Sequence, residues 1–269
     1  MKNILFTTIF TLLYFSGKAK FSENINYGKI SFERVLNFDG NLETTEFDLF
    51  FSPNFSVFSE KTAQQKKSST LKPSTDDEFD LSFDVKFNGS KYVVLTDFKR
   101  DSIYSQVSLF KNGKQTTYIV CEKAKKIKWE ITQEFKMISG FKAQKATCLF
   151  RGRNYSAWFT KKIPIKYGPW KLNGLPGLIL NVSDDKNEVA FNVTKIEIPN
   201  IKNTKSNNYF EFNKTFKKIS LKEYIKLKKG QVEEVMKLFG AKLPRGSNMK
   251  ISTVKSKAIE LEYENTVEN

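Results

Sequence analysis

The chain has 269 residues, a net charge of +16, two cysteines and no histidine. This length can bury a substantial core and fits one large all-β domain or two small ones, and we predict one domain. The lack of histidine excludes Ser-His-Asp and Cys-His catalysis and every histidine-based metal site. The remaining options for chemistry are carboxylate, lysine, tyrosine or serine groups, and no motif indicates a metal or another cofactor.

The first residues have the pattern of a secretory signal peptide. Lys2 precedes an apolar run from Ile4 to Phe15, and Gly17 and Ala19 are small. We predict a signal peptide over residues 1–19 with cleavage after Ala19, an uncleaved anchor being the alternative. Residues 20–269 are then expected to be a secreted, periplasmic or envelope-associated protein without an integral membrane span. Its positive charge can attract an anionic envelope component, a peptide or a glycan, the alternative being a merely solvated basic face, and export argues against nucleic acid.

Strand patterns dominate from residue 27 to about residue 198. Residues 81–87 alternate strictly between apolar and polar side chains. Asp39-Gly40, Asn88-Gly89 and Asn112-Gly113 are dipeptides of tight hairpins. Further strands are predicted near residues 126–132, 141–150, 154–161, 178–183 and 188–198. Since short turns join neighbouring strands, the sheet should be antiparallel. Residues 60–80 are polar and aperiodic, which predicts a mobile loop.

A helix is predicted after residue 220. Ser220 and Glu223 have the spacing of a capping box, and Gly240 suits a C-terminal cap. One apolar stripe is predicted along the helix at Leu221, Ile225, Val232, Val235, Met236 and Phe239. Residues 259–263 alternate in character and predict a final strand. The expected fold is one mainly β domain: a curved antiparallel sheet, open or half-barrel-like, with one long C-terminal helix packed against it.

Cys121 and Cys148 can be bridged in an oxidising compartment or remain free. In a meander with one strand between theirs, they would lie about 10 Å apart, too far for a disulfide. Free thiols are therefore favoured over a bridge.

The segment Gly168–Val182, GPWKLNGLPGLILNV, is rich in glycine and proline around an apolar run. Pro176 and Gly177 suit the central positions of a type II turn, with positive φ at Gly177. Gly174 and Gly177 also allow another backbone or a ligand to approach closely. We predict a buried junction between a turn and a strand as the role of the structural motif Gly174, Leu175, Pro176, Gly177, Leu178 and Ile179.

Upstream of this motif, arginines lie among aromatic residues. Guanidinium groups and aromatic rings can bind carboxylates, phosphates or sugars. The alternative is that the tryptophans belong to the core and the arginines are surface charges. The candidate ligand-binding residues are Arg151, Arg153, Trp158, Tyr167 and Trp170.

With these residues the chain resembles the GLPGLI family of secreted proteins from Bacteroidota-type bacteria, named after the segment matched by residues 174–179. The resemblance extends to WEIT at 129–132, ISGFKAQKAT at 138–147, FRGR at 150–153, AWFT at 157–160 and IPIKYGP at 163–169. One departure is Ala143, where many members carry a cysteine. The resemblance implies an exported β-rich protein and supplies no catalytic residue.

The expected function is non-catalytic binding of a lipid, peptide or glycan in the periplasm or at the envelope, since a curved sheet with an apolar inner face can hold such a ligand. The alternative is an envelope enzyme that acts on glycans or peptides through carboxylate or lysine chemistry.

Overall fold

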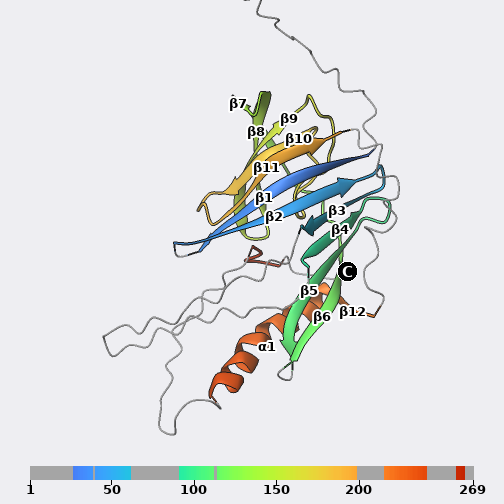
Figure 1. Ribbon diagram of the computed structural model, residues 1–269, viewed down its shortest axis with the longest axis vertical. Coiled ribbons are helices and arrows are strands. Elements are labelled where there is room, and N and C mark those ends of the chain that lie inside the picture. Colours follow the sequence, from blue (N-terminus) through green and yellow to red (C-terminus); the bar gives the residue numbers. More distant parts are fainter. Residues whose placement is uncertain are drawn as a thin grey trace, which may run out of the picture.

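The computed structural model describes residues 27–38, 40–61, 91–111, 114–198, 215–240 and 259–263. Over these residues the chain is mainly β, with twelve strands in one sheet and one helix (Figure 1). The elements are β1 (Gly28–Phe38), β2 (Asn41–Phe51), β3 (Phe55–Glu60), β4 (Val93–Asp97), β5 (Ser102–Lys111), β6 (Lys114–Lys123), β7 (Glu130–Ile138), β8 (Phe141–Phe150), β9 (Arg153–Thr160), β10 (Leu178–Asp184), β11 (Val189–Glu197), β12 (Lys217–Ser220) and α1 (Leu221–Gly240).

The sheet is twisted and stays open, with the strand order β12-β6-β5-β4-β3-β2-β1-β11-β10-β9-β8-β7. Strands β1 to β6 form one antiparallel run and β7 to β11 form a second. Pairing of β1 with β11 joins the two runs. The sheet is not wholly antiparallel as we expected, because β12 pairs parallel to β6. A strand that follows a long connection is free of the reversal that a hairpin turn imposes.

Several local predictions are confirmed within the described residues. A hairpin joins β1 to β2, with Gly40 at φ 78°. Strand β5 pairs antiparallel with β6, and the predicted Asn112-Gly113 turn between them lies outside the described residues. The strand predicted at 126–132 begins later, at residue 130, and the strand predicted at 259–263 is not formed. The signal peptide, residues 62–80 of the predicted loop, the strand at 81–87 and the Asn88-Gly89 turn lie outside the described residues.

The inner face of the sheet is filled by the connection between β9 and β10. Large side chains on this face, such as Phe32, Phe47 and Phe191, are fully buried. The same hydrophobic cluster contains side chains of the connection, and the ring of Tyr167 stacks on Phe51 with centroids 5.2 Å apart. The members that the connection contributes are Ile163, Ile165, Tyr167, Trp170, Leu172 and Leu175. Among the described residues, side chains of the connection therefore occupy the inner face on which we expected an apolar ligand.

Helix α1 begins at the predicted residue and packs against β5, β6 and β12. The Ser220 hydroxyl accepts a hydrogen bond from the Glu223 backbone amide at 3.1 Å, which is an N-cap. Tyr224 and Ile225 pack on a second hydrophobic cluster. Its buried members are Leu109, Tyr118, Val120, Ile219 and Leu221. The predicted stripe beyond Gly230 lies outside the side chains that the structure describes.

The glycine-rich motif turns the chain from the buried connection into β10. The positive φ predicted at Gly177 is found at Gly174 instead, at 94°. Gly177 has a different requirement, because a β-carbon there would lie 2.2 Å from the carbonyl oxygen of Thr160. Close approach of two backbones, rather than turn type, therefore explains the second glycine.

Both thiols are free, and eight strands, rather than the expected one, separate β6 and β8 in the sheet order. Burial raises the pKa of Cys148 to about 12 and also raises the pKa of Cys121. The thiolate is the form that reacts. We therefore expect iodoacetamide at pH 8 to modify Cys148 only after denaturation and Cys121 slowly before it, as measured by mass spectrometry. A mass that shows no alkylation of the denatured, unreduced protein would instead indicate a disulfide.

No helix among the described residues is long and apolar enough to span a membrane.

Candidate functional site

The structure separates the five candidate ligand-binding residues. Arg151, Arg153, Tyr167 and Trp170 are buried, with exposed fractions of 5%, 2%, 7% and 3%. Trp158 is partly exposed and lies on the opposite, solvent-facing side of the sheet. The residues therefore do not form one site but lie in two separate places.

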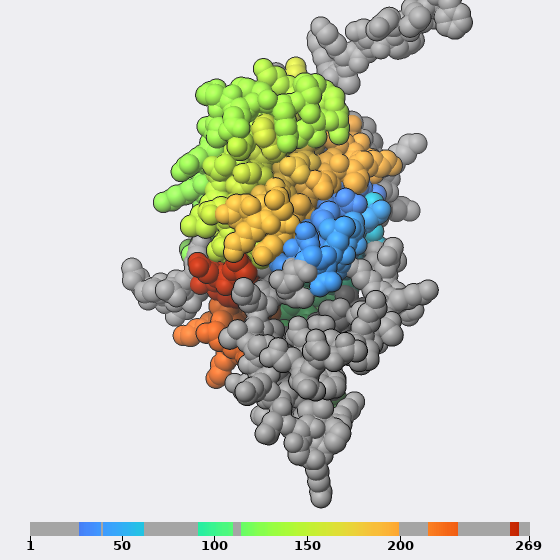
Figure 2. Space-filling model, turned by 90° about the vertical axis from the view of Figure 1, so that its left-hand side faces the viewer, coloured from blue at the N-terminus to red at the C-terminus, as the bar shows by residue number. Residues whose placement is uncertain are grey.

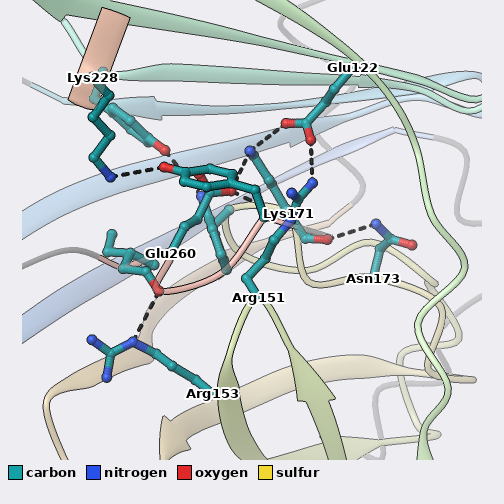
Figure 3. Close-up of polar contacts among 11 residues, drawn as sticks. Glu122, Arg151, Arg153, Lys171, Asn173, Lys228 and Glu260 are labelled. Carbon is teal, nitrogen blue, oxygen red and sulfur yellow. Dashed lines mark hydrogen bonds and ion pairs between the residues drawn. The ribbon is translucent and has the colours of Figure 1, made fainter. Parts of the chain in front are cut away.

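The first place is a buried cluster of charged side chains (Figure 3). Four separate parts of the chain supply it. Arg151 comes from the turn between β8 and β9, and Lys171 comes from the β9–β10 connection. Glu122 comes from β6, and Glu260 comes from the segment 259–263. We call these four residues the charge cluster.

Within the charge cluster every side chain contacts an opposite charge. Glu122 accepts hydrogen bonds from Arg151 Nη2 and Lys171 Nζ. Lys171 Nζ also donates to Glu260 Oε1 at 2.6 Å, and Arg151 Nε lies 3.7 Å from the same oxygen. The exposed fractions of the four side chains are between 2% and 12%. Two cations and two carboxylates thus balance in a buried space.

The ionised state of Lys171 depends on its carboxylate neighbours. Burial alone would lower the pKa of Lys171, but the charges of Glu260 and Glu122 outweigh burial and raise it. Lys228, beside the cluster, has its pKa lowered by burial and by the charge of Lys171. Lys171 therefore remains an ammonium group at neutral pH, held by ion pairs rather than free to act as a base or nucleophile.

Two residues of this region have unusual backbones. Arg151 has φ 53° and is followed by Gly152 at φ 77°, so both central residues of the β8–β9 hairpin are left-handed. Asn or Gly is favoured at the first of these positions, and another residue costs about 1 kcal/mol or more. Trp170, directly before Lys171, has φ 56°. The backbone is therefore strained at Arg151 and directly before Lys171, the two residues that supply the cations of the charge cluster.

Arg153 forms hydrogen bonds with several neighbouring elements beside the charge cluster. Its Nη1 donates to Asp184 Oδ2 at 2.5 Å and to Glu188 Oε2 at 2.6 Å. Its Nε donates to the carbonyl oxygen of Ile259 at 3.0 Å. Asp184 also accepts the Val189 amide, at 2.9 Å. Arg153 thus connects β9, the β10–β11 turn and the segment 259–263.

The second place is a polar row on the solvent-facing side of the sheet. It follows directly paired residues across β8, β9, β10, β11, β1 and β2, which lie side by side across one face (Figure 2). Asn181 Nδ2 donates to Asn192 Oδ1 at 2.6 Å, so adjacent members touch. We define the polar row as Lys145, Trp158, Asn181, Asn192, Glu33 and Glu46.

Trp158 is the aromatic member of the polar row. Lys136 Nζ lies 4.1 Å from the centroid of its ring, and the neighbouring Lys145 forms an ion pair with Glu134 at 2.9 Å. An indole beside an amide and two lysines offers a flat apolar surface and hydrogen-bonding groups together. This combination suits a polar ligand with a flat apolar side, such as a sugar ring.

Sequence reasoning missed Glu122, Lys171, Glu260 and all of the polar row except Trp158. The available signal for Glu122 was its inward register in β6, two positions after the buried Val120. Within the described residues, no group of three or more acidic or cysteine side chains could hold a metal ion.

The fold and the site define a mainly β protein with a buried charge cluster and a polar sheet face. The family model described as "N-glycanase peptide, N-terminal domain" matches residues 85–226, more than half of the chain. The chain therefore belongs to this family. No curated protein matches it.

Solved structures give weaker similarities. Two crystal forms of PNGF-II are 15% and 16% identical, with TM-scores of 0.48 and 0.49, over 75% of this chain. The chain spans about a third of the length of PNGF-II, namely 33% and 32% of the two chains. A DUF1329 family protein from Desulfovibrio piger is 8% identical with a TM-score of 0.22, over 70% of this chain and 91% of that one.

Proposed function

We propose that the protein is a non-catalytic glycan-binding protein of the cell envelope and that the polar row binds the glycan. The observation that carries this proposal is the polar row itself, in which a partly exposed indole lies between Lys145 and Asn181, and Asn181 is hydrogen-bonded to Asn192. A sugar ring can stack its C–H face on the indole while its hydroxyls exchange hydrogen bonds with Asn181 and Asn192.

Family membership supports the choice of a glycan over a lipid or a peptide carrier role. The matching family is the N-terminal domain of an N-glycanase, which suggests N-linked glycans as the ligand class. The filled inner face gives no support to a lipid carrier, because the β9–β10 connection occupies it. The proposed glycan site does not include Arg151 and Arg153, because their charged groups already form ion pairs with buried carboxylates.

The rival proposal, an enzyme with carboxylate or lysine chemistry, gains no specific support from the charge cluster. Its two carboxylates are paired with Arg151 and Lys171 and have side-chain exposures of 2% and 12%. A general acid or base must reach a substrate within hydrogen-bonding distance. Carboxylates that are buried and paired in this way are not positioned to exchange a proton with a substrate.

Export and membership of the GLPGLI family form part of the same proposal. The supporting features are the leader pattern of residues 1–19 and the specific order of residues 174–179. The segments that carry the resemblance also cooperate in space, since Phe150, Phe159, Ile163 and Leu178 share one hydrophobic cluster.

The test is binding of a soluble N-glycan to the full chain, measured by isothermal titration calorimetry. We expect Trp158→Ala to weaken binding at least about tenfold, because stacking is lost, and Trp158→Phe to weaken it less. Asn154→Ala is the matched control, since Asn154 lies on the same strand and face but outside the polar row. Equal affinities for Trp158→Ala, Asn154→Ala and the parent would contradict the proposal.

A further inference from the structure

The segment 259–263 contacts the rest of the chain in the manner of a bound peptide (Figure 3). The carbonyl oxygen of Ile259 accepts a hydrogen bond from Arg153, and Glu260 accepts one from Lys171. The amides of Leu261 and Glu262 donate to one carbonyl oxygen, that of Arg151, at 3.0 and 3.3 Å. Along the segment, a main-chain hydrogen bond is thus followed by an ion pair and then by two further main-chain hydrogen bonds.

An aromatic anchor ends the segment. The Tyr263 hydroxyl accepts a hydrogen bond from Lys228 Nζ at 2.9 Å. The ring of Tyr263 meets the ring of Tyr224 edge-on, with centroids 6.1 Å apart. Ile259 at the other end packs against the main hydrophobic cluster. The segment therefore bridges the two hydrophobic clusters across the charge cluster.

The attachment uses side chains and a few isolated main-chain hydrogen bonds rather than a strand ladder. Among the described residues the segment pairs with no strand of the sheet. Leu261 and Glu262 are exposed, and the segment lies at the surface beside the helix (red in Figure 2). A peptide that is held in this way can dissociate without breaking the sheet, because the sheet's hydrogen bonds do not depend on it.

The residues that bind the segment are positioned by the sheet and the buried connection, not by the segment itself. Arg151, Lys171 and Glu122 come from the sheet and the buried connection, and strained residues position both cations. Glu122 neutralises one of the two positive charges. The other positive charge remains for the carboxylate of a ligand, which is the role that Glu260 fills. Such preorganised side chains are typical of binding sites.

Glu260 does not provide an acceptor for every hydrogen-bond donor of the site. The Nε of Arg151 is buried and has no hydrogen-bond partner among the residues that the structure describes, although it lies 3.7 Å from Glu260 Oε1. Buried donors are nearly always hydrogen-bonded, so an unpaired one indicates a missing acceptor. A carboxylate placed slightly deeper can bind Lys171 and Arg151 at once.

We propose that Arg151, Lys171 and Glu122, with Tyr224 and Lys228, form a binding site for an extended acidic peptide, which the chain fills with its own residues 259–263. The ligand class is a segment with a glutamate, an aliphatic residue directly before it and a tyrosine three positions after it. A second peptide of this pattern enters when it displaces the chain's own segment. This peptide-binding site is separate from the polar row, so a negative result for it would not contradict the proposed glycan function.

The test uses the full chain and a fluorescent synthetic peptide with the sequence of residues 256–265, SKAIELEYEN. The Glu260→Gln substitution weakens the binding of residues 259–263 to the rest of the chain. We therefore expect fluorescence anisotropy to show saturable binding of the synthetic peptide to this variant. The parent protein should bind the peptide at least about fivefold more weakly, because its own segment competes. If Glu260→Gln does not fold by circular dichroism, Tyr263→Ala weakens the segment and leaves the charge cluster intact.

Two substituted peptides make the test specific. Replacing the first glutamate, equivalent to Glu260, by glutamine should weaken binding at least about tenfold, because the buried ion pair is lost. Replacing the second, equivalent to the exposed Glu262, should change it less than about twofold. Equal effects of the two substitutions, or no binding, would overturn the proposal. Failure of both Glu260→Gln and Tyr263→Ala to fold would overturn it too, since the segment would then be an obligatory part of the core.

Discussion

Gly177→Ala should lower the free energy of unfolding by about 3 kcal/mol, the upper end of the range for overpacking a buried site. The new β-carbon would lie 2.2 Å from the carbonyl oxygen of Thr160 and 2.7 Å from its carbonyl carbon. Both atoms belong to the backbone at the end of β9, so no flexible side chain can move aside. The clash would push β9 away from the junction where the buried connection enters β10.

Gly230→Ala is the matched control for this substitution. Nothing lies within 4 Å of a β-carbon at Gly230. Alanine favours helix over glycine by about 1 kcal/mol, so this variant should be as stable as the parent or more stable. Chemical denaturation followed by circular dichroism measures both. Coinciding midpoints for the two variants would show that the approach of Thr160 to Gly177 does not constrain the fold.

Local features of the sequence predict local features of this fold well. Strand β8 has the bounds that we expected, residues 141–150. Ser220 begins the helix because its hydroxyl satisfies a free amide of the first turn. The Asp39-Gly40 hairpin follows from the positive φ that glycine tolerates.

Long-range pairing could not be predicted in the same way. The contact of β1 with β11 and the parallel contact of β12 with β6 join segments with no shared local signal. Arg151 and Arg153 fit a ligand site or a charged surface equally well from their neighbours alone. Their actual partners, Glu122 and Asp184, are 29 and 31 residues away in sequence. Residues 259–263 alternate like a strand, yet their side chains are used by the charge cluster and both hydrophobic clusters.

The charge cluster provides the second large effect. Lys171→Met should lower the free energy of unfolding by about 3–5 kcal/mol, the cost of removing one partner from a buried ion pair. Methionine matches the length of the lysine stem, so packing changes little. The loss arises because Glu122 and Glu260 would then face a single cation, Arg151, with one negative charge in excess. Lys162→Met is the control, since Lys162 is an exposed lysine of the same connection.

A second substitution separates charge from packing. Adding Glu260→Gln to Lys171→Met removes the excess negative charge and leaves the neutral pair of Arg151 and Glu122. The double variant should therefore be more stable than Lys171→Met alone by about 1–2 kcal/mol, the size of coupling expected for residues in contact. In the parent background Glu260→Gln should instead destabilise, because it leaves an unbalanced cation in a buried space. If Glu260→Gln has the same effect in both backgrounds, the two side chains do not interact, and the segment 259–263 is held by its tyrosine and its main-chain hydrogen bonds alone.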